Sequence, residues 1–187
     1  MTALSEPSAA TQYLSFQLAG DEYAVNILRV REIIEYPELT RVPGTPPSIR
    51  GVINLRGHVV PVLDLVVRFG QPASEITRWS CIVIVDMELD GQSTKMGILA
   101  DSVSEVVDLR GDDIEPPPAF GTAVHVEYLV GMGKSGNKFI LLLNMDRILG
   151  AREIDGLRHL GTEDSAEDIS DNQSLNADLE ANEVTGS

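Results

Sequence analysis

The chain has 187 residues, of which 43% are hydrophobic, and a formal net charge of −15. This length allows one or two small domains with a real core, and the composition is that of an ordinary soluble protein. The negative charge argues against a nucleic-acid-binding protein, because such proteins present a basic surface to phosphates.

The sequence holds no apolar run long enough to span a membrane. Its amino terminus has neither the basic region nor the apolar region of a signal peptide. We therefore expect a cytoplasmic protein that does not insert directly into a membrane.

The negative charge is concentrated near the carboxyl terminus. Residues 153–187 hold ten acidic residues and one arginine, a net charge of −9, which leaves −6 for residues 1–152. This acidic segment is poor in aromatic residues, so it cannot bury enough apolar surface to offset its ordering entropy. We predict a disordered acidic tail over 155–187, with one amphipathic turn at 157–160 as the alternative there. Such a tail either adds solubility or tunes the affinity for charged partners.

The first half of the chain is predicted to form short β-strands joined by turns. Alternating or β-branched residues indicate strands at 13–18, 23–27, 30–36, 52–53 and 59–63, with the turn of the last pair at 54–57. The third of these also has helical spacing, but its β-branched content favours a strand. Gly57 stands where a hairpin turn needs positive φ, and Gly70 ends a short helical turn that begins at residue 65.

A second set of strands follows the polar linker 71–77. Strands are predicted at 81–87, 95–100, 103–107, 128–132 and 139–144, with a short helix at 145–149. Asp90-Gly91 and Gly136-Asn137 are hairpin-turn signals, and three consecutive prolines from Pro116 mark a loop.

The two sets of strands resemble each other. Residues 30–34 match 103–107 at an offset of 73, and the hairpin 51–65 matches 131–145 at an offset of 80. Such a repeat suggests two similar small β-units rather than one sheet. Five short strands per unit predict a mostly all-β fold of two small barrels. We expect them over about 12–70, with closing elements, and over 78–149.

The sequence shows no recognisable catalytic or metal-binding constellation. The single cysteine, Cys81, lies in an apolar run, where a buried and inert thiol is expected. Gly133-Lys134-Ser135 lacks the earlier glycine of a phosphate-binding loop, so we interpret it as part of a hairpin turn. His58, His125 and His159 do not have the spacing of metal ligands. We expect no enzyme activity and no cofactor.

Apolar residues at equivalent places in the two units indicate a protein-binding surface. They either belong to the core or line a groove between the units, rimmed by Glu32 and Arg56, that suits an amphipathic partner helix. The apolar residues are Ile27, Val30, Ile33, Ile34, Val103, Val106 and Val107.

Arg56 is a full charge beside a turn between two apolar strands. It either lies over the barrel rim with its charge in water or is displayed for a partner. Its counterpart in the repeat is Gly136, so the hairpin itself does not require an arginine. We therefore assign Arg56 to a surface of the first unit alone.

Together these residues resemble the CheW family of bacterial chemotaxis adaptors, from Tyr13 to about Leu149. The most specific part is Asn-Leu-Arg-Gly at 54–57, followed by Val-Pro-Val-Leu-Asp-Leu at 60–65. The other motifs are Phe16-Gln17-Leu18, Glu22-Tyr23, Val30-Arg31-Glu32-Ile33, Pro43 with Pro46-Pro47, 49–53, 101–106 and 128–131.

The resemblance implies a domain over 12–154 made of two intertwined five-stranded SH3-like barrels, acting as a scaffold without catalysis. Proteins of this family couple the regulatory domain of the histidine kinase CheA to the cytoplasmic tip of methyl-accepting chemoreceptors. By position, the receptor-binding groove is then expected to comprise Ile27, Val30, Glu32, Ile33, Arg56 and Val103. The kinase-binding end of the first barrel is expected to comprise Ile49, Arg50, Gly51 and Asn54.

Three alternatives remain beside this function. An adaptor of the same fold in pilus-driven motility or another chemosensory-like pathway fits the same residues. A small β-barrel enzyme or ligand-binding domain needs a cluster of polar groups with perturbed pKa values in a pocket, which the sequence does not indicate. A nucleic-acid-binding barrel needs exposed aromatic residues beside Lys and Arg, and the net charge disfavours it.

Overall fold

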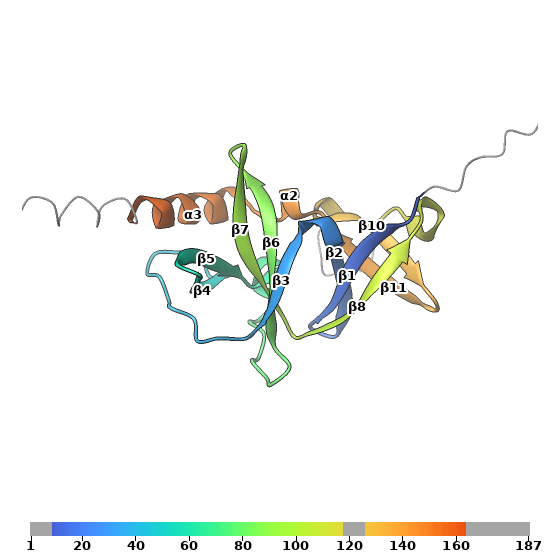
Figure 1. Cartoon of the computed structure of the whole chain (residues 1–187), viewed down its shortest axis with the longest axis horizontal. Coiled ribbons are helices and arrows are strands. Elements are labelled where there is room, and N and C mark those ends of the chain that lie inside the picture. Colours follow the sequence, from blue (N-terminus) through green and yellow to red (C-terminus); the bar gives the residue numbers. More distant parts are fainter. Residues whose placement is uncertain (1–8, 118–125, 164–187) are drawn as a thin grey trace, which may run out of the picture.

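The computed structural model describes residues 9–117 and 126–163, with side chains to residue 160. These residues form two β-sheets that lie side by side, with short helical segments around them (Figure 1). Most of the described structure is strand, as the sequence predicted. Within this part of the chain, no helix is both long enough and apolar enough to cross a membrane.

The first barrel is the five-stranded sheet with the order β3-β6-β7-β5-β4. Its strands are β3 (Val30–Glu35), β4 (Ile49–Leu55), β5 (His58–Leu63), β6 (Cys81–Leu89) and β7 (Gln92–Ala100). The second barrel is the six-stranded sheet with the order β8-β1-β2-β11-β10-β9. Its strands are β1 (Thr11–Leu18), β2 (Asp21–Asn26), β8 (Ser102–Leu109), β9 (Ile114–Glu115), β10 (Leu129–Ser135) and β11 (Lys138–Leu143).

Each barrel takes strands from both halves of the chain. Strands β1 and β2 join β8 and β11, whereas β6 and β7 join β3 and β5. The exchange depends on two parallel pairings, Tyr23 with Leu141 and Val62 with Gly97. The expected division into 12–70 and 78–149 is therefore wrong, although the barrels are intertwined as the resemblance implied. Parallel pairing between distant strands leaves no local sequence signal, so the repeat could not reveal it.

The internal repeat is visible in the topology. The order β3-β6-β7-β5-β4 of the first barrel recurs as β8-β1-β2-β11-β10 in the second. In both copies the strand register shifts at a bulge, after Val30 in β3 and after Val103 in β8. The offsets of 73 and 80 therefore identify structurally equivalent positions. Strand β9 was not predicted, because two residues are too few to form a pattern.

Three apolar clusters form the core. One lies in the first barrel and includes Val60 and Ile84, and another lies in the second barrel and includes Val107 and Ile140. The third, which we call the shared cluster, is the largest and draws residues from both sheets and from the short helices α1 and α2. Burial of this shared apolar surface holds one barrel against the other.

The short helical segments connect the strands. They are the helices α1 (Leu65–Arg68) and α2 (Met145–Ile148) and the single 3-10 turns Ile27–Arg29, Gly111–Asp113 and Val126–Tyr128. The predicted turn at Gly57 and the end of α1 at Gly70 are confirmed, with φ of 84° and 83°. The second strand ends one residue earlier than expected, because the Asn26 side chain accepts a hydrogen bond from the Leu28 amide and starts a turn.

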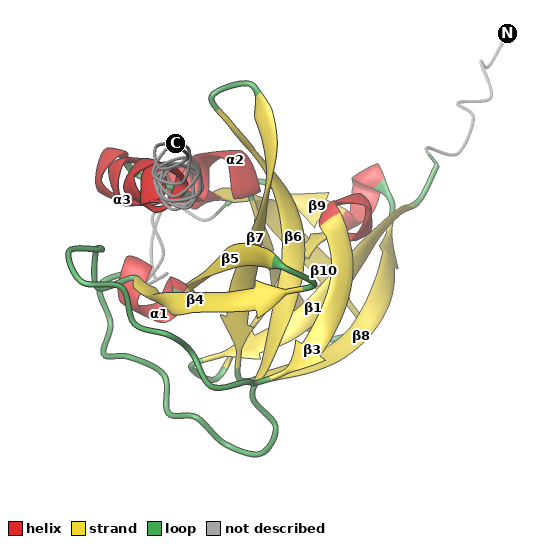
Figure 2. Ribbon diagram, turned by 60° about the vertical axis from the view of Figure 1, so that its left-hand side comes forward, coloured by secondary structure: helices red, strands yellow, loops and turns green. Residues whose placement is uncertain are grey.

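The structure corrects the expected start of the acidic tail. Helix α3 (Ala151–Glu163) occupies residues that were predicted to be disordered from 155 or to form one turn at 157–160 (Figure 2). The remainder of the predicted tail, 164–187, lies outside the described residues.

Tertiary contacts explain why α3 forms in a segment that the sequence composition predicted to be disordered. Leu157 is buried, and Leu160 packs against the shared cluster. Glu153 is buried and accepts a hydrogen bond from Ser48 Oγ at 2.8 Å. Arg158 forms a two-pronged ion pair with Asp90 in the β6–β7 hairpin. A helix of this length is stabilised mainly by such contacts, which the local sequence does not show.

We predict that Leu157→Ala lowers the free energy of unfolding by about 2 kcal/mol, the low end for a buried leucine, because α3 lies at the periphery. The matched control is Arg152→Ala, an exposed position on the same helix, for which we expect a change within about 0.5 kcal/mol. Urea denaturation of the full chain measures both. Equal stability of the two variants would show that α3 does not dock.

Candidate protein-binding surfaces

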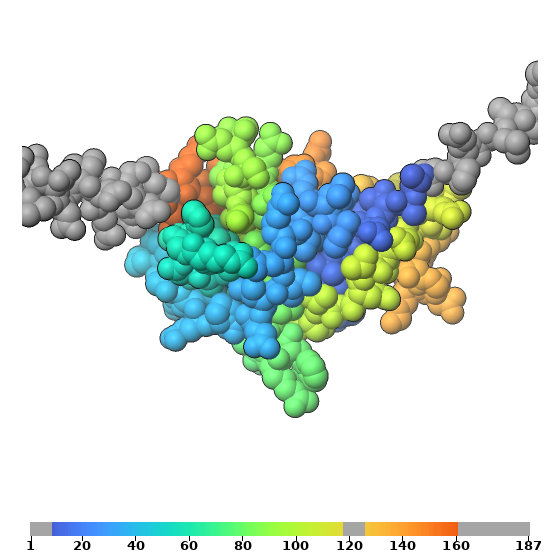
Figure 3. All heavy atoms as spheres, in the orientation of Figure 1, coloured from blue at the N-terminus to red at the C-terminus, as the bar shows by residue number. Residues whose placement is uncertain are grey.

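The apolar residues of the expected groove lie where the two barrels meet. Ile27, Val30 and Val103 are half-buried and pack against the shared cluster. Ile33 on β3 and Val106 on β8 remain exposed. Figures 1 and 2 both place β3 beside β8, and Figure 3 shows their surfaces next to each other near the middle of the molecule. We call these five residues the junction groove.

Strand register explains why these side chains share one face. Val30 and Ile33 pair with Val85 and Val83, which both belong to the shared cluster. A bulge at Arg31 puts an extra residue between them, so residues three apart face the same way. Directly paired residues point to the same side of a sheet, so Val30 and Ile33 face the junction.

Glu32 and Arg56 lie on a different face from the groove. Glu32 pairs with Ile84, which belongs to the cluster inside the first barrel. Its carboxylate accepts two hydrogen bonds from the Arg56 guanidinium, at 2.8 and 3.0 Å. Arg56 follows β4 and Glu32 lies on β3, so the pair joins the two outer strands of the sheet and closes the barrel rim.

The fold itself has little need of the Arg56 side chain. Its side chain is 73% exposed, and ion pairs at such positions contribute only about 0–1 kcal/mol. Arg56 has φ of 52°, an unusual value for a residue with a side chain, and Gly136 has 60° at the equivalent position. The arginine is thus neither needed by the turn nor a large source of stability.

Sequence reasoning missed the 3-10 turn beside the groove. Leu28 is 80% exposed, and it stands between Ile27 and Arg29. Arg29 forms an ion pair with Asp146, and Arg31 forms one with Asp86. The hydrogen bond to Asp86 raises the pKa of Arg31. The signal that could have located this turn is Asn26, a residue type that favours turn starts, whose side chain accepts a hydrogen bond from the Leu28 amide.

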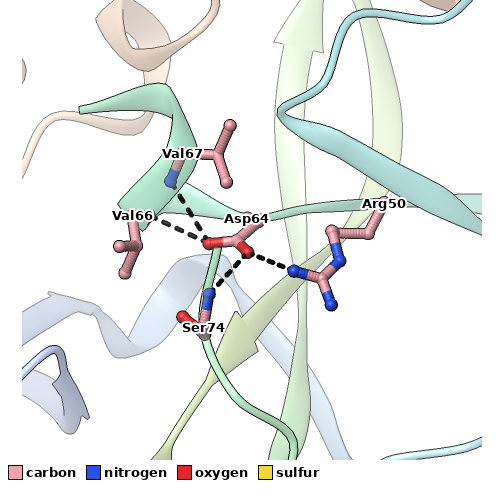
Figure 4. A network of polar contacts seen from close by, with 5 residues as sticks. All are labelled: Arg50, Asp64, Val66, Val67 and Ser74. Atoms are coloured by element: carbon pink, nitrogen blue, oxygen red, sulfur yellow. Dashed lines mark hydrogen bonds and ion pairs between the residues drawn. The ribbon is translucent and has the colours of Figure 1, made fainter. Parts of the chain in front are cut away.

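One of the expected kinase-binding residues, Arg50, binds a buried carboxylate. Asp64 is fully buried, and its Oδ2 accepts a hydrogen bond from Arg50 Nη1 at 2.9 Å (Figure 4). Its other oxygen accepts hydrogen bonds from the amides of Val66 and Val67, so Asp64 caps α1. The Ser74 amide lies 3.4 Å from Oδ2. Arg50 is therefore a structural partner of Asp64 and only partly exposed.

The repeat keeps the backbone of this cap but not its charge. The Asp64 amide donates to Ser48 O at 2.7 Å, and the equivalent Asn144 amide donates to Tyr128 O at 2.7 Å. Val130 stands in the place of Arg50 and is exposed. The charged pair is thus a property of the first barrel.

A large open concavity of about 1090 Å³ lies at this end of the first barrel. The loop 36–47 forms one wall, and Ile49, Arg50, Val67 and Gln71 contribute to the other. The loop is fixed by backbone hydrogen bonds between Thr40 and Val52. We call this the loop concavity.

The other expected kinase-binding residues have mainly structural positions. Ile49 is buried in the shared cluster. A Cβ atom at Gly51 would lie 2.6 Å from the Thr40 carbonyl oxygen, so only glycine lets the loop approach β4. Asn54 is exposed, and its Oδ1 accepts a hydrogen bond from the Gly57 amide at 2.8 Å, which holds the hairpin turn. Ile49 and Gly51 thus help to hold the wall of the loop concavity, and Asn54 holds the turn between β4 and β5.

The titratable groups follow their surroundings. The Cys81 thiol is buried, as predicted, and burial raises its pKa, against the lowering effect of a backbone hydrogen bond with Val103. Burial, with the nearby Asp21 carboxylate, raises the pKa of Tyr23 to about 12. Among residues 9–117 and 126–160, no group of His, Cys, Asp and Glu side chains has the arrangement of a metal site.

The fold and its surfaces define a class: an intertwined two-barrel β-protein with an apolar junction groove and a separate loop concavity. Comparison with known proteins identifies a family with this fold. The model of the CheW-like domain matches residues 12–153. The chain belongs to the CheW family.

Characterised relatives cover most of this chain. The chemotaxis protein CheW of Klebsiella aerogenes is 34% identical over 154 residues, which are 82% of this chain and 90% of the relative. That of Bacillus subtilis is 33% identical over 152 residues, covering 80% and 92%. The crystal structure of the scaffolding protein TtCheW from Thermoanaerobacter tengcongensis has 31% identity and a TM-score of 0.68, covering 82% of this chain and 94% of its own.

We predict that Asp64→Ala lowers the free energy of unfolding by about 3–5 kcal/mol, because it removes the cap of α1 and leaves the Arg50 charge without its partner. Asp64→Asn is the matched variant, since it keeps the shape and the side-chain oxygen, as Asn144 does in the repeat. We expect a smaller loss for it in chemical denaturation. Equal losses for both variants would contradict a role for the cap.

Proposed function

We propose that this protein is a non-catalytic adaptor of bacterial chemotaxis, which couples the cytoplasmic tip of chemoreceptors to the regulatory domain of a CheA-type histidine kinase. The observation that carries the proposal is that one two-barrel unit of the CheW family presents two separate surfaces. Partners of this kind lie in the cytoplasm, and we place the protein there, associated with membrane receptor arrays only through them.

The junction groove suits an amphipathic helix, and we assign it to the receptor tip. Ile33 and Val106 offer exposed apolar side chains over a base of half-buried Ile27, Val30 and Val103. A helix binds such a surface through apolar residues spaced three and four apart. Burying one aliphatic side chain completely contributes about 1.5–3 kcal/mol, so a few contacts of this kind suffice for micromolar binding. Glu32 and Arg56, at the neighbouring rim, add polar contacts and orientation.

The loop concavity is the surface that we assign to the kinase. It lies at the end of the first barrel and combines apolar residues such as Leu39 and Val42 with the charged Arg41 and Glu38. In this assignment Ile49, Arg50 and Gly51 support the surface through their hydrogen bonds and packing, and the loop residues make the contact. A mixed apolar and charged lining is typical of a protein interface.

We predict that Ile33→Asp weakens binding to a receptor hairpin tip by about 2 kcal/mol, a roughly thirtyfold loss, because it puts a charge into an apolar contact. The matched control is Ile76→Asp. Ile76 is 41% exposed against 45% for Ile33, and it lies in the loop before β6. Isothermal titration calorimetry with a soluble receptor tip measures both. Equal affinity of the two variants would rule out the groove.

We further predict that Val42→Asp lowers affinity for the kinase regulatory domain by about tenfold or more, while affinity for the receptor tip is retained. Ile33→Asp should give the opposite pattern. The Val42 carbonyl oxygen accepts a hydrogen bond from the Thr45 hydroxyl, and the substitution keeps this backbone contact of the loop. If each variant weakens both interactions equally, the assignment of two separate surfaces fails.

A further inference from the structure

The rim of the second barrel contains a polar pocket that neither proposed interface uses. Its volume is about 420 Å³, and it is lined by side chains from β1, β2, β8 and the β10–β11 hairpin. The charged residues in the lining are Glu22, Glu105 and Lys138. The polar residues are Gln17, Ser104, Ser135 and Asn137.

The strand register identifies the equivalent positions in the first barrel. Val103 pairs with Phe16 as Val30 pairs with Val85, and Val106 pairs with Leu14 as Ile33 pairs with Val83. It follows that Glu105 is the counterpart of Glu32, that Ser104 is the counterpart of Arg31, and that Gln17 is the counterpart of Asp86. Gly136, between β10 and β11, is the counterpart of Arg56.

The first barrel fills this place with two arginines. Arg56 binds Glu32 with two hydrogen bonds, at 2.8 and 3.0 Å, and Arg31 binds Asp86. In the second barrel both arginines are replaced by small residues, Ser104 and Gly136, while the glutamate is kept. The pocket therefore lies at positions equivalent to those that carry Arg31 and Arg56 in the first barrel.

The kept glutamate forms no ion pair with a described side chain, although Lys138 lines the same pocket. The Glu105 amide donates a hydrogen bond to Ser15 Oγ, and its carbonyl oxygen accepts one from the same hydroxyl, so the strand position is fixed. No ion pair joins the Glu105 or Glu22 carboxylate to a described side chain, whereas Glu32 is paired in the other copy. Glu32, the counterpart of Glu105 in the first barrel, thus already binds an arginine side chain in this molecule.

From this comparison we infer that the pocket binds an arginine side chain of a partner protein, with Glu105 as its main ligand. The partner supplies in trans the contact that Arg56 supplies within the chain in the first barrel. Arginine is the fitting cation, because its planar fork forms two parallel hydrogen bonds with a carboxylate and lysine cannot. Glu22 adds a second negative charge beside it, and Gln17 and Ser135 offer oxygen acceptors.

The probe for this site is N-acetyl-arginine amide, titrated into the full-length protein and followed by two-dimensional ¹H–¹⁵N NMR. We expect the amides of Glu105, Ser135 and Lys138 to shift, with a dissociation constant on the order of millimolar, as one exposed pair allows. Glu105→Gln should weaken binding about fivefold while the spectrum elsewhere stays unchanged. N-acetyl-lysine amide at equal concentration should bind several-fold more weakly.

A second variant tests the pocket without a ligand. Gly136→Arg places an arginine where the first barrel has one, on a backbone with φ of 60° against 52° at Arg56. We expect it to raise the melting temperature relative to Gly136→Gln, which carries the same backbone strain without the charge. It should also abolish the shifts caused by N-acetyl-arginine amide. Adding Glu105→Gln should remove the gain in melting temperature.

Three results would overturn the inference. The first is that N-acetyl-arginine amide leaves the pocket amides unshifted, and the second is that Glu105→Gln binds it as strongly as the natural chain. The third is equal binding of the lysine analogue, which would show a general attraction for cations. Equal melting temperatures for Gly136→Arg and Gly136→Gln would show in addition that Glu105 is not aligned with the hairpin.

Discussion

The buried carboxylate of Asp64 is the interaction on which the junction of the two barrels depends. A buried charge is tolerated only when it is paired and hydrogen-bonded, and Asp64 has Arg50 and the amides of α1 as partners. Helix α1 has four residues, too few to be stable alone, so its cap and its packing fix its position.

The position of α1 in turn sets the contacts between the barrels. Phe69, at its end, stacks between Tyr23 and Tyr128, each with a ring-centroid distance of 5.9 Å. Arg68 Nε donates to the Ile148 carbonyl oxygen at 2.7 Å, and the guanidinium lies 4.9 Å from the centre of the Tyr128 ring. One capped turn of helix thus joins the first barrel to β2, to α2 and, through Glu153, to α3.

Local sequence predicted the hairpins and the short helices correctly, because their turns have strong residue preferences. Gly57 and Asp90-Gly91 mark them without tertiary information. The exchange of strands and helix α3 escaped prediction because long-range contacts determine both. The sequence also did not show that Glu32 faces away from Val30 and Ile33, because a bulge at Arg31 shifts the alternation of faces and the residue pattern alone cannot locate a bulge. Arg50 and Asn54 form hydrogen bonds within the fold that the sequence did not predict, and their role in binding a kinase stays a prediction.

The two surfaces of the first barrel are joined by a single strand. Val30 and Ile33 of β3 line the junction groove, and the chain that leaves β3 at Tyr36 immediately lines the loop concavity. Six strand residues span roughly 20 Å, so the two surfaces are separate but are connected by one strand. Because β3 is hydrogen-bonded to β6 on one side and tied to β4 through Glu32 and Arg56 on the other, it cannot shift without altering the barrel rim. Arg56 adds little stability, but through Glu32 it links β3, which carries groove residues, to β4, which carries residues of the loop concavity.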